Sequence, residues 1–337
     1  MPRDTAPVSV IMPAYNAEAT VARALASIAR QTLVPAEVIV VDDGSSDATA
    51  ETARAMQERM GGAKLIVVTQ ENKGAGAARN RAIAAATQPY LAFLDADDEW
   101  LGEKLERSMQ VMQDGDYLLV AHDYLDATPD GDVHIDCRRR FEEKPDPYVT
   151  LYLKGYIPSI SVVTKRDAVV AAGGFDETLR NAQDFDLWLK LLADPGTRFT
   201  LFGEALARYH HVDGSIMSHT DRRIACCREI AVRYMPALRT RGASTFSNLW
   251  HRLAIIYGEA ARAQPARTSN FALSALVAFV TLTCRAIAPP SDATLAPRQS
   301  GHTAAVWLGA AWIFGILGMY LMQFRDMAGP ILQIFGL

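Results

Sequence analysis

The chain has 337 residues, of which 50% are hydrophobic and 21% charged, so it can bury a sizeable core and does not read as disordered. Its formal net charge of −4 argues against a general nucleic-acid binder, because such proteins carry a basic surplus that neutralises phosphates. The four cysteines form no CxxC pair, which favours reduced thiols, and the first residues lack the apolar core of a signal peptide. We therefore expect the N-terminal domain to stay in a reducing compartment.

The first 125 residues alternate short β-rich runs with alanine-rich stretches of helical length. The runs are 8–15, 37–44, 63–70, 90–97 and 116–123, and the stretches are 18–31, 47–60, 74–86 and 101–113. The runs are almost wholly apolar, as in strands that helices cover on both faces. This pattern predicts an α/β fold with an open, mainly parallel sheet flanked by helices.

Polar residues follow each of the first four runs, at the points where the strands end. They occupy residues 13–16, 42–47, 72–74 and 95–98. Parallel strands end at one edge of a sheet, and ligands of open α/β sheets bind beyond that edge. We therefore expect the four polar clusters to lie together.

The fourth cluster, Asp95-Ala96-Asp97-Asp98, is the most acidic. Two carboxylates at i and i+2 on a turning backbone can face one point and supply the hard oxygen ligands that Mg²⁺ or Mn²⁺ prefers. The alternative is that Asp97 and Asp98 cap the following helix, since aspartate suits a helix start. The position beside three other polar clusters favours the metal site.

The second and third clusters suggest a nucleotide. An acidic residue at the tip of a buried strand, such as Asp42, can accept hydrogen bonds from a nucleobase or a ribose. Lys73 and Arg79 stand at a helix opening, where free amides and the helix dipole favour an anion such as a diphosphate. The glycine pair Gly74 and Gly76 could instead serve close helix packing, because neither a Rossmann fingerprint nor a P-loop occurs.

Five stretches resemble family 2 glycosyltransferases of the GT-A fold, which move a sugar from a nucleotide diphosphate donor to an acceptor hydroxyl. In the family's order, over residues 8–212, they are VSVIMPAYNAEATVARALASIARQT, EVIVVDDGSSDAT, NKGAGAARNRAI, LAFLDADDEW and GGFDETLRNAQDFDLWLKLL. The resemblance implies a nucleotide-sugar site formed by Pro13, Ala14, Tyr15, Asp42, Asp43, Lys73, Arg79, Asp95 and Ala96. Within it, Asp42 would read a uracil-type base, Asp95 would lie near the ribose, and Asp97 would ligate the Mn²⁺ or Mg²⁺ that bridges the donor diphosphate.

The family's catalytic base falls in a Glu-Asp pair before an amphipathic helix, which here reads Gln183-Asp184. The resemblance implies that Asp184 takes the acceptor's proton in a single, inverting displacement. Gln183 departs from the usual glutamate. On the residues alone, Asp184 could instead cap a helix over 185–193, with Asp186 as a competitor for either role.

The resemblance also implies contacts outside the nucleotide. Acceptor or donor-sugar contacts would come from Gly174, Phe175, Asp176, Gln183 and Trp188, although Asp176 could equally stabilise a turn. The stretch ARYHHVDGSIMS is similar to the family's segment that closes over the pyrophosphate, and there His211 aligns as a metal or phosphate contact. A structural histidine is the alternative.

The chain divides by pattern into three regions. We expect a catalytic domain over 1–215, with a nucleotide-sugar half (1–125) and an acceptor half (126–215), then a helical extension over 216–265 and a hydrophobic region over 266–337. The uncharged run 304–322 reaches the length that spans a bilayer. A second uncharged run, 271–284, is short for a span unless it continues past Arg285 to residue 288, so a membrane hairpin over 271–288 and 304–322 competes with a pair of buried helices.

These patterns lead to one functional expectation and two rivals. We expect a glycosyltransferase on the cytoplasmic side of the inner membrane, acting on a lipid-linked or saccharide acceptor in exopolysaccharide or cell-envelope synthesis. The rivals are another nucleotide-using enzyme, such as a nucleotidyltransferase, and a non-catalytic scaffold of the same fold.

Overall fold

The computed structural model describes residues 5–211, 220–242 and 245–263. The chain divides into two units, Met1–Ser274 and Ala275–Leu337, and all the described residues belong to the first unit. The hydrophobic region expected over 266–337, with its candidate membrane helices, lies outside the described residues. Within the described ranges, no helix combines the length and apolar character needed to cross a membrane.

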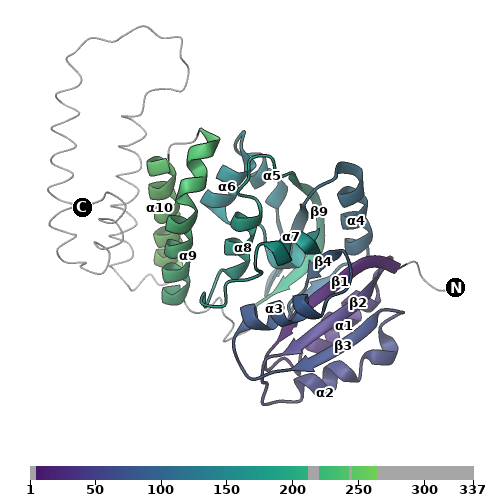
Figure 1. The fold of residues 1–337 in the computed structure, drawn as a ribbon. Helices are drawn as coiled ribbons and strands as arrows, with labels where there is room; N and C mark the ends of the chain where they lie inside the picture. Colours follow the sequence, from purple (N-terminus) through teal and green to yellow (C-terminus); the bar gives the residue numbers. More distant parts are fainter. Residues whose placement is uncertain (1–4, 212–219, 243–244, 264–337) are drawn as a thin grey trace, which may run out of the picture. The chain divides into compact units, whose positions relative to one another are not determined.

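The N-terminal half is a parallel sheet flanked by helices (Figure 1). Its strands are β1 (Thr5–Ala14), β2 (Val34–Asp42), β3 (Lys64–Thr69) and β4 (Tyr90–Phe93), in the spatial order β3-β2-β1-β4. Between them run α1 (Val21–Ala29), α2 (Thr49–Arg54), the short 3₁₀ helix η1 (Gln57–Arg59) and α3 (Ala75–Ala85). The expected β/α alternation is confirmed, and the four strand ends lie at one edge of the sheet.

Burial on both faces explains why these strands read as continuous apolar runs. Even-numbered residues such as Val10 and Val40 pack with Leu25 of α1 in one core cluster. The odd-numbered Ile11 and Ile39 point to the opposite face, because strand side chains alternate, and they are buried as well. Helix α3 contacts β1 and β2.

The second half makes the sheet mixed, so the expectation of a mainly parallel sheet is wrong beyond β4. Strand β4 pairs antiparallel with β8 (Val163–Lys165), β8 antiparallel with β6 (Leu119–Thr128), and β6 parallel with β9 (Phe199–His210). Strand β9 pairs antiparallel with the two-residue β5 (Glu99–Trp100), and β7 (Gly131–Ile135) forms a hairpin with β6. Strands as short as β5 and β8 carry too few residues for any periodicity to show.

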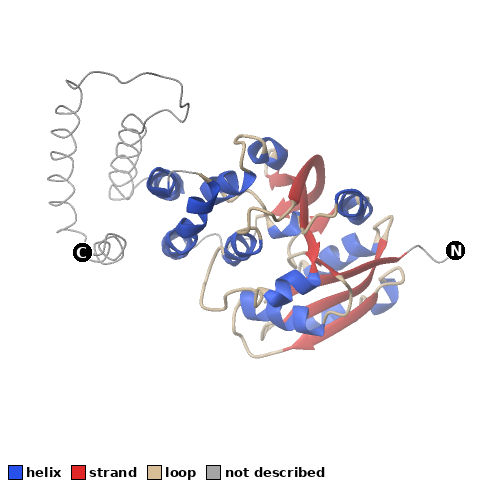
Figure 2. Cartoon of the chain, turned by 45° about the horizontal axis from the view of Figure 1, so that its top comes forward, coloured by secondary structure: helices blue, strands red, loops and turns tan. Residues whose placement is uncertain are grey.

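Helices surround this half of the sheet (Figure 2). They are α4 (Lys104–Gly115), α5 (Cys137–Phe141), α6 (Pro147–Lys154), the 3₁₀ helix η2 (Ser159–Ser161), α7 (Arg166–Ala171) and α8 (Gln183–Leu191). The chain continues through α9 (Thr220–Tyr234), the 3₁₀ helix η4 (Met235–Arg241) and α10 (Thr245–Ala263), as expected for a helical extension. The extension docks on α6, where the Tyr152 hydroxyl donates to the Ala231 carbonyl at 2.7 Å and Arg252 donates to the Leu153 carbonyl at 3.0 Å.

A glycine turn joins the two halves after α7. Gly174 has a φ of 70°, and the next residue, Phe175, donates its amide to Asn80 Oδ1 at 2.8 Å while its carbonyl accepts from Asn80 Nδ2 at 2.9 Å. Asn80 lies in α3, so the turn is fastened to the nucleotide half. A Cβ atom on Gly174 would overlap Asn80 Oδ1, whereas one on the neighbouring Gly173 would meet open space.

We expect Gly174→Ala to lower the free energy of unfolding by about 2 to 4 kcal/mol, since the variant adds left-handed backbone strain to the loss of the Asn80 contacts. Gly173→Ala is the matched control, because Gly173 also has a positive φ, of 81°, but no neighbour in the way. It should lose only the backbone part, about 1 to 2 kcal/mol. Urea unfolding measures both, and equal losses would contradict the fastening role of Asn80.

Candidate functional site

A buried arginine marks the candidate site. Arg79 lies in α3, and its guanidinium donates to Asp95 Oδ1 at 2.6 Å, with the Phe175 ring centroid 5.4 Å away. Burial lowers the pKa of Arg79, but the carboxylates of Asp95, Asp184 and Asp97 outweigh burial and raise it. Three acidic side chains, two from the end of β4 and one from α8, therefore share a single buried cation.

The turn after β4 presents Asp97. The Asp98 amide donates to the Asp95 carbonyl at 3.1 Å, which closes a tight turn over residues 95–98. The Asp97 carboxylate has no hydrogen-bond or ion-pair partner among the described residues, and its pKa is raised first by burial and then by the charge of Asp95. Ala96 is buried in the core beneath the turn.

The capping alternative for Asp97 and Asp98 is wrong. The next helix, α4, begins at Lys104 and is preceded by Glu103. Asp98 is only 1% exposed and accepts the His210 amide at 2.8 Å, and burial raises the pKa of its carboxyl well above the ordinary value. Asp98 thus joins the turn to β9, while Asp97 is left for a ligand.

Asp184 lies in the first turn of α8, where its Oδ1 accepts the Phe185 amide at 2.8 Å. The helix begins at Gln183, and its N-cap is Ala182, so Asp184 is not the cap that the sequence allowed. Ala182 has a φ of 56°, a left-handed conformation that costs an alanine about 1 to 2 kcal/mol. Burial raises the pKa of Asp184, and Asp95 adds to the rise, while Arg79 opposes it.

Asp186, the competitor of Asp184, is committed elsewhere. It is fully buried, and its Oδ1 accepts from Arg233 of α9 at 2.8 Å. Within one helical turn, therefore, Asp186 is a structural carboxylate, whereas the charge of Asp184 acts on Arg79. Of the two, Asp184 is the candidate general base.

The ends of β1 and β2 are held together by hydrogen bonds. The Asn16 amide donates to Ser45 Oγ at 2.8 Å, and Asn16 Oδ1 accepts the Ser46 amide at 2.9 Å. The buried Asp42 accepts from the amide and the hydroxyl of Ser45. Tyr15, which is 54% exposed, is presented at this edge beside the partly buried Pro13 and the buried Ala14.

Asp43 differs from its expected role as a donor contact. Its two carboxylate oxygens accept from Gln70 Nε2 at 2.8 Å, from the Lys73 amide at 2.9 Å and from the Gly74 amide at 2.7 Å. Asp43 therefore shapes the loop that leads into α3. The Lys73 side chain, by contrast, is exposed and has no partner among the residues that the structure describes.

Arg180, which the sequence did not suggest as a site residue, has an exposed side chain beside the start of α3. Its Nη1 would be 3.8 Å from a Cβ atom built on Gly74. A second basic side chain therefore stands with Lys73 at the opening of α3. The signal in the sequence was a lone arginine four residues before Asp184, which no spacing rule connects with a helix a hundred residues earlier.

Two aromatic residues expected to contact the acceptor are core residues instead, because Trp188 and Phe175 are buried. Both rings pack edge-on against Phe93, with centroids 5.6 and 5.7 Å away, and the Trp188 indole donates to the Ile157 carbonyl at 3.1 Å. The packed rings lie next to the site, because the Phe175 ring also lies beside the Arg79 guanidinium.

Gln183 and Asp176 also have structural partners. Gln183 donates to the Leu179 carbonyl at 2.6 Å and packs on Gly76, where a Cβ would approach Gln183 Nε2 to 2.6 Å. Gly76 therefore serves close packing, the alternative left open for it. Burial would raise the pKa of Asp176, but hydrogen bonds from Thr178 and from Arg233 prevail and lower it to about 2. Asp176 stabilises its turn.

His211 is placed at the end of β9. Its side chain is 62% exposed, and its Nε2 lies 2.6 Å from Asp126 Oδ1. The residues that follow, 212–219, lie outside the described part of the chain. The structure thus gives His211 a partner on β6, and its expected role at the metal stays a prediction.

The carboxylates fit a divalent cation that is shared with a ligand. Within residues 5–211, 220–242 and 245–263, no three His, Cys, Asp or Glu side chains are grouped closely enough to hold a metal ion by themselves. Asp97 is nonetheless a free oxygen ligand in a locally acidic turn. Mg²⁺ and Mn²⁺ sites often use one or two carboxylates, with phosphate oxygens and water completing the shell.

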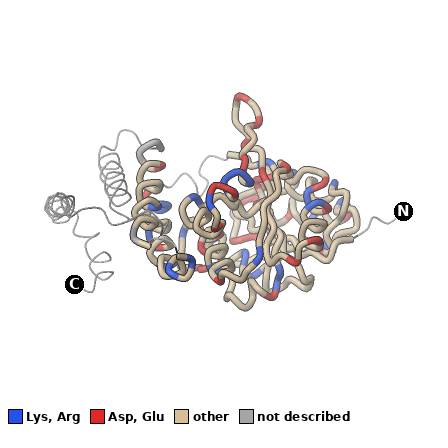
Figure 3. The backbone as a smooth tube through the Cα atoms, turned by 90° about the horizontal axis from the view of Figure 1, so that it is seen from above, with Lys and Arg blue, Asp and Glu red and all other residues tan. Residues whose placement is uncertain are grey.

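Basic and acidic residues are interspersed along the described backbone (Figure 3). A cavity of about 280 Å³ lies beside β7 and α5, lined by His134, Ile135, Asp136, Arg139, Arg140 and Glu143. None of these residues belongs to the expected donor or acceptor set.

We expect Asp184→Asn to raise the melting temperature at pH 7.5 by roughly 2 to 4 °C, the shift that about 1 kcal/mol produces in a domain of this size. The folded-state pKa of Asp184 lies above its ordinary value of 3.8, so ionisation costs stability above the folded pKa. The gain should shrink as the pH falls through the folded-state pKa and should vanish below 3.8, where the carboxyl is protonated in both states.

Asp176→Asn is the matched control with the opposite sign. Its lowered pKa, about 2, means that its ionised form stabilises the fold above pH 3.8 and that this contribution fades as the pH falls toward 2. The variant should therefore melt at a lower temperature at pH 7.5. Differential scanning fluorimetry at pH 7.5 and 4.5 tests both variants. A lower melting temperature for Asp184→Asn than for the wild type at pH 7.5 would contradict the claim that the ionised Asp184 carboxylate destabilises the fold.

Comparisons with known proteins agree with this geometry. The family model described as glycosyl transferase family 2 matches residues 9–166. The amylovoran biosynthesis glycosyltransferase AmsB of Erwinia amylovora is 34% identical over 213 residues, which cover 60% of this chain and 69% of that protein. The Escherichia coli protein named UDP-Glc:alpha-D-GlcNAc-diphosphoundecaprenol beta-1,3-glucosyltransferase WfgD is 30% identical over 213 residues, covering 63% and 80% of the two chains.

Solved structures show the same fold. The S. aureus TarS 1-349 structure in complex with UDP-GlcNAc aligns with a TM-score of 0.57 at 20% identity and covers 83% of this chain and 91% of that chain. The mannosyltransferase PcManGT of Pyrobaculum calidifontis, in complex with GDP-Man and Mn2+, aligns with a TM-score of 0.55 at 21% identity, covering 85% and 81% of the two chains. With its motifs, its fold and its relatives in agreement, the chain belongs to the family 2 glycosyltransferases.

Proposed function

We propose that the protein is an inverting, metal-dependent glycosyltransferase that takes its sugar from a UDP-sugar. The observation that carries the proposal is the buried Arg79, which pairs with Asp95 after β4 at 2.6 Å and whose pKa is also raised by the charges of Asp184, at the head of α8, and of Asp97. A donor held at the end of β4 would present its anomeric carbon toward Asp184 at the head of α8. The UDP-GlcNAc complex of the structural neighbour TarS and the UDP-Glc in the name of WfgD support a uridine donor.

The donor would extend along the edge formed by the strand ends. Tyr15 and Asp42 lie where a nucleoside would bind, and the exposed Lys73 and Arg180 flank the opening of α3, where free amides favour a diphosphate. Asp97 would hold Mn²⁺ or Mg²⁺, which neutralises charge on the departing diphosphate. The Mn2+ in the PcManGT structure supports the use of a divalent ion by a protein of this fold.

Asp184 would act as the general base. Burial and Asp95 raise its pKa while Arg79 opposes the rise, so the carboxylate is more basic than that of an ordinary aspartate. As the acceptor oxygen forms its bond to the anomeric carbon, its proton passes to Asp184 and the bond to the diphosphate breaks. A single displacement inverts the configuration at that carbon.

The acceptor would be a lipid-linked glycan on the cytoplasmic side of the inner membrane. The names of the relatives support this step: one is a diphosphoundecaprenol glucosyltransferase and another takes part in amylovoran biosynthesis. The uncharged run 304–322, which lies outside the described residues, supports attachment through the C-terminal region.

Release of the nucleotide diphosphate tests the proposal. Purified protein with Mn²⁺ would be incubated with a panel of UDP-, GDP- and dTDP-sugars, with and without membrane lipid extract. We expect UDP release that depends on the metal and increases with the extract. Release from a GDP- or dTDP-sugar alone would refute the uridine donor, and no release from any donor would favour a non-catalytic scaffold.

We expect Asp184→Asn to lower kcat by about 10³-fold, within the range that a positioned general base supplies, while UDP affinity stays within about threefold. Asp186→Asn is the matched control, because Asp186 lies in the same helical turn but is paired with Arg233. It should lose stability and keep its turnover at temperatures where it remains folded. More than a tenth of the wild-type kcat in Asp184→Asn would place the base elsewhere.

A further inference from the structure

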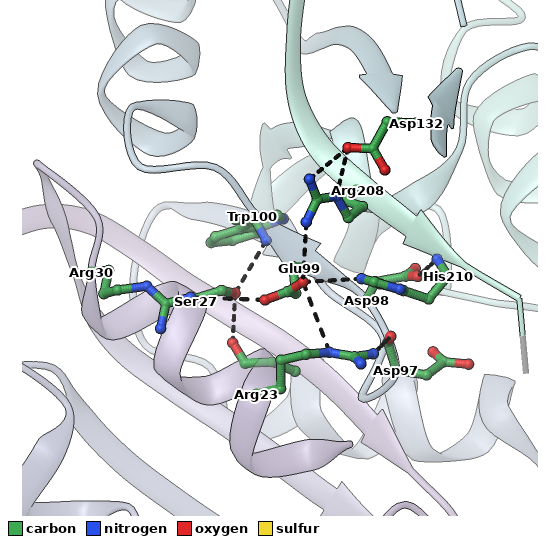
Figure 4. A network of polar contacts seen from close by, with 11 residues as sticks. Arg23, Ser27, Arg30, Asp97, Asp98, Glu99, Trp100, Asp132, Arg208 and His210 are labelled. Carbon is green, nitrogen blue, oxygen red and sulfur yellow. Dashed lines mark hydrogen bonds and ion pairs between the residues drawn. The ribbon is translucent and has the colours of Figure 1, made fainter. Parts of the chain in front are cut away.

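A second polar cluster stands behind the Asp97 turn and is centred on Glu99 (Figure 4). Glu99 begins β5, and its side chain is 16% exposed. The His210 ring lies 3.0 Å from its carboxylate, and three arginines surround it at 3.8 to 4.0 Å: Arg30, Arg23 and Arg208. No part of the proposed chemistry uses this carboxylate.

The cluster reaches the Asp97 turn from two sides. Arg23 of α1 contacts Glu99 and also donates through Nη2 to the Asp97 carbonyl at 2.5 Å. His210 of β9 contacts Glu99 through its ring and donates its amide to Asp98 at 2.8 Å. Figure 4 shows the Asp97 carbonyl meeting Arg23 while the Asp97 carboxylate points away from the cluster.

The ion pairs between Glu99 and the three arginines contribute little to the stability of the fold. The side chains of Arg23, Arg30 and Arg208 are 39%, 64% and 37% exposed, and ion pairs of such exposed groups contribute little to folding. Strand β5, which follows the turn, has only two residues, and they pair with Arg208 and Ala207 of β9. Arg208 also pairs with Asp132 at 2.5 Å, so loss of the Glu99 carboxylate would leave Arg23 and Arg30 as like charges near the turn.

We propose that Glu99 is a positioning residue for the donor and metal site. By drawing Arg23 to the Asp97 carbonyl and the end of β9 to Asp98, it fixes the backbone from which Asp95 and Asp97 project. The proposal rests on the proposed function, since it assigns Glu99 to the same site. Outer contacts that orient a ligating carboxylate typically change metal affinity or activity by about 10- to 100-fold when they are removed.

Glu99→Gln tests the proposal, because it removes the charge and keeps the shape. We expect the Mn²⁺ concentration for half-maximal UDP release to rise about 10-fold, and calorimetry to show a similar loss in the affinity for UDP with Mn²⁺. The kcat at saturating Mn²⁺ should fall by less than about threefold, because Asp184 is untouched. Arg23→Gln, which alters a more exposed side chain, should act in the same direction and serves if Glu99→Gln folds poorly.

Glu204→Gln is the matched control. Glu204 lies on β9, the strand with which β5 pairs, and its carboxylate pairs with Arg107 of α4 at 2.6 Å. This variant should change the melting temperature as much as Glu99→Gln does and leave the Mn²⁺ requirement within twofold of the wild type. If the two variants shift the Mn²⁺ requirement equally, or if neither does, the positioning role is refuted.

Hydrogen exchange of the unliganded protein separates this inference from the proposed function. We expect Glu99→Gln, and not Glu204→Gln, to speed amide exchange about 10-fold in peptides covering 94–100 and 206–211, because the Asp98 and His210 amides lose their fixed partners. Unchanged exchange overturns the positioning role whatever the enzyme does. If Glu99→Gln exchanges faster but the wild-type protein binds no UDP, the positioning role stands and only the proposed function is overturned.

Discussion

The candidate site depends on one buried guanidinium, that of Arg79. A buried charge without a partner costs several kcal/mol, so α3 can pack against the sheet only if carboxylates come to it. Asp95 arrives from β4 and Asp184 from α8, and the Phe175 ring lies beside the guanidinium. The position of α3 is fixed in turn by Asp43 at its opening and by Asn80 on its second half. The requirement to neutralise one arginine thus draws the two halves of the catalytic domain together.

The same arrangement leaves more negative charge than Arg79 can balance. The Asp97 carboxylate has no side-chain hydrogen-bond or ion-pair partner among the described residues, and burial raises the pKa of both Asp97 and Asp184. Ala182 is held in a left-handed conformation just before Asp184, and Asn16 is held so at the nucleoside end. Unbalanced charge and backbone strain both lower the stability of the folded chain. They are typical of ligand-binding and catalytic sites, where a bound ligand can offset the charge. The surrounding carboxylates of Asp43, Asp98, Asp176 and Asp186 are engaged by hydrogen bonds or arginines, whereas the Asp184 carboxylate accepts a hydrogen bond only from the Phe185 amide among the described residues.

Sequence patterns predicted the parallel half of the sheet because β1 to β4 are buried on both faces and read as apolar runs. They could not predict β5 and β8, because the strands with which these two pair lie far away in the sequence. At the site, the pattern identified the acidic turn but could not separate Asp97 from Asp98, since only the distant His210 amide distinguishes them. Phe175 and Trp188 failed as acceptor contacts for a similar reason, because a motif shows that an aromatic residue is needed and not whether a ligand or the core covers it.

A crystal structure of the protein with UDP and Mn²⁺, analysed by anomalous scattering of manganese, tests the central claim most directly. The account predicts one manganese peak within bonding distance of an Asp97 carboxylate oxygen and of the UDP phosphates, with Asp184 facing the same space and Arg79 still paired with Asp95. A manganese ion bound away from Asp97, or an Asp184 carboxylate turned away from the diphosphate, would contradict it.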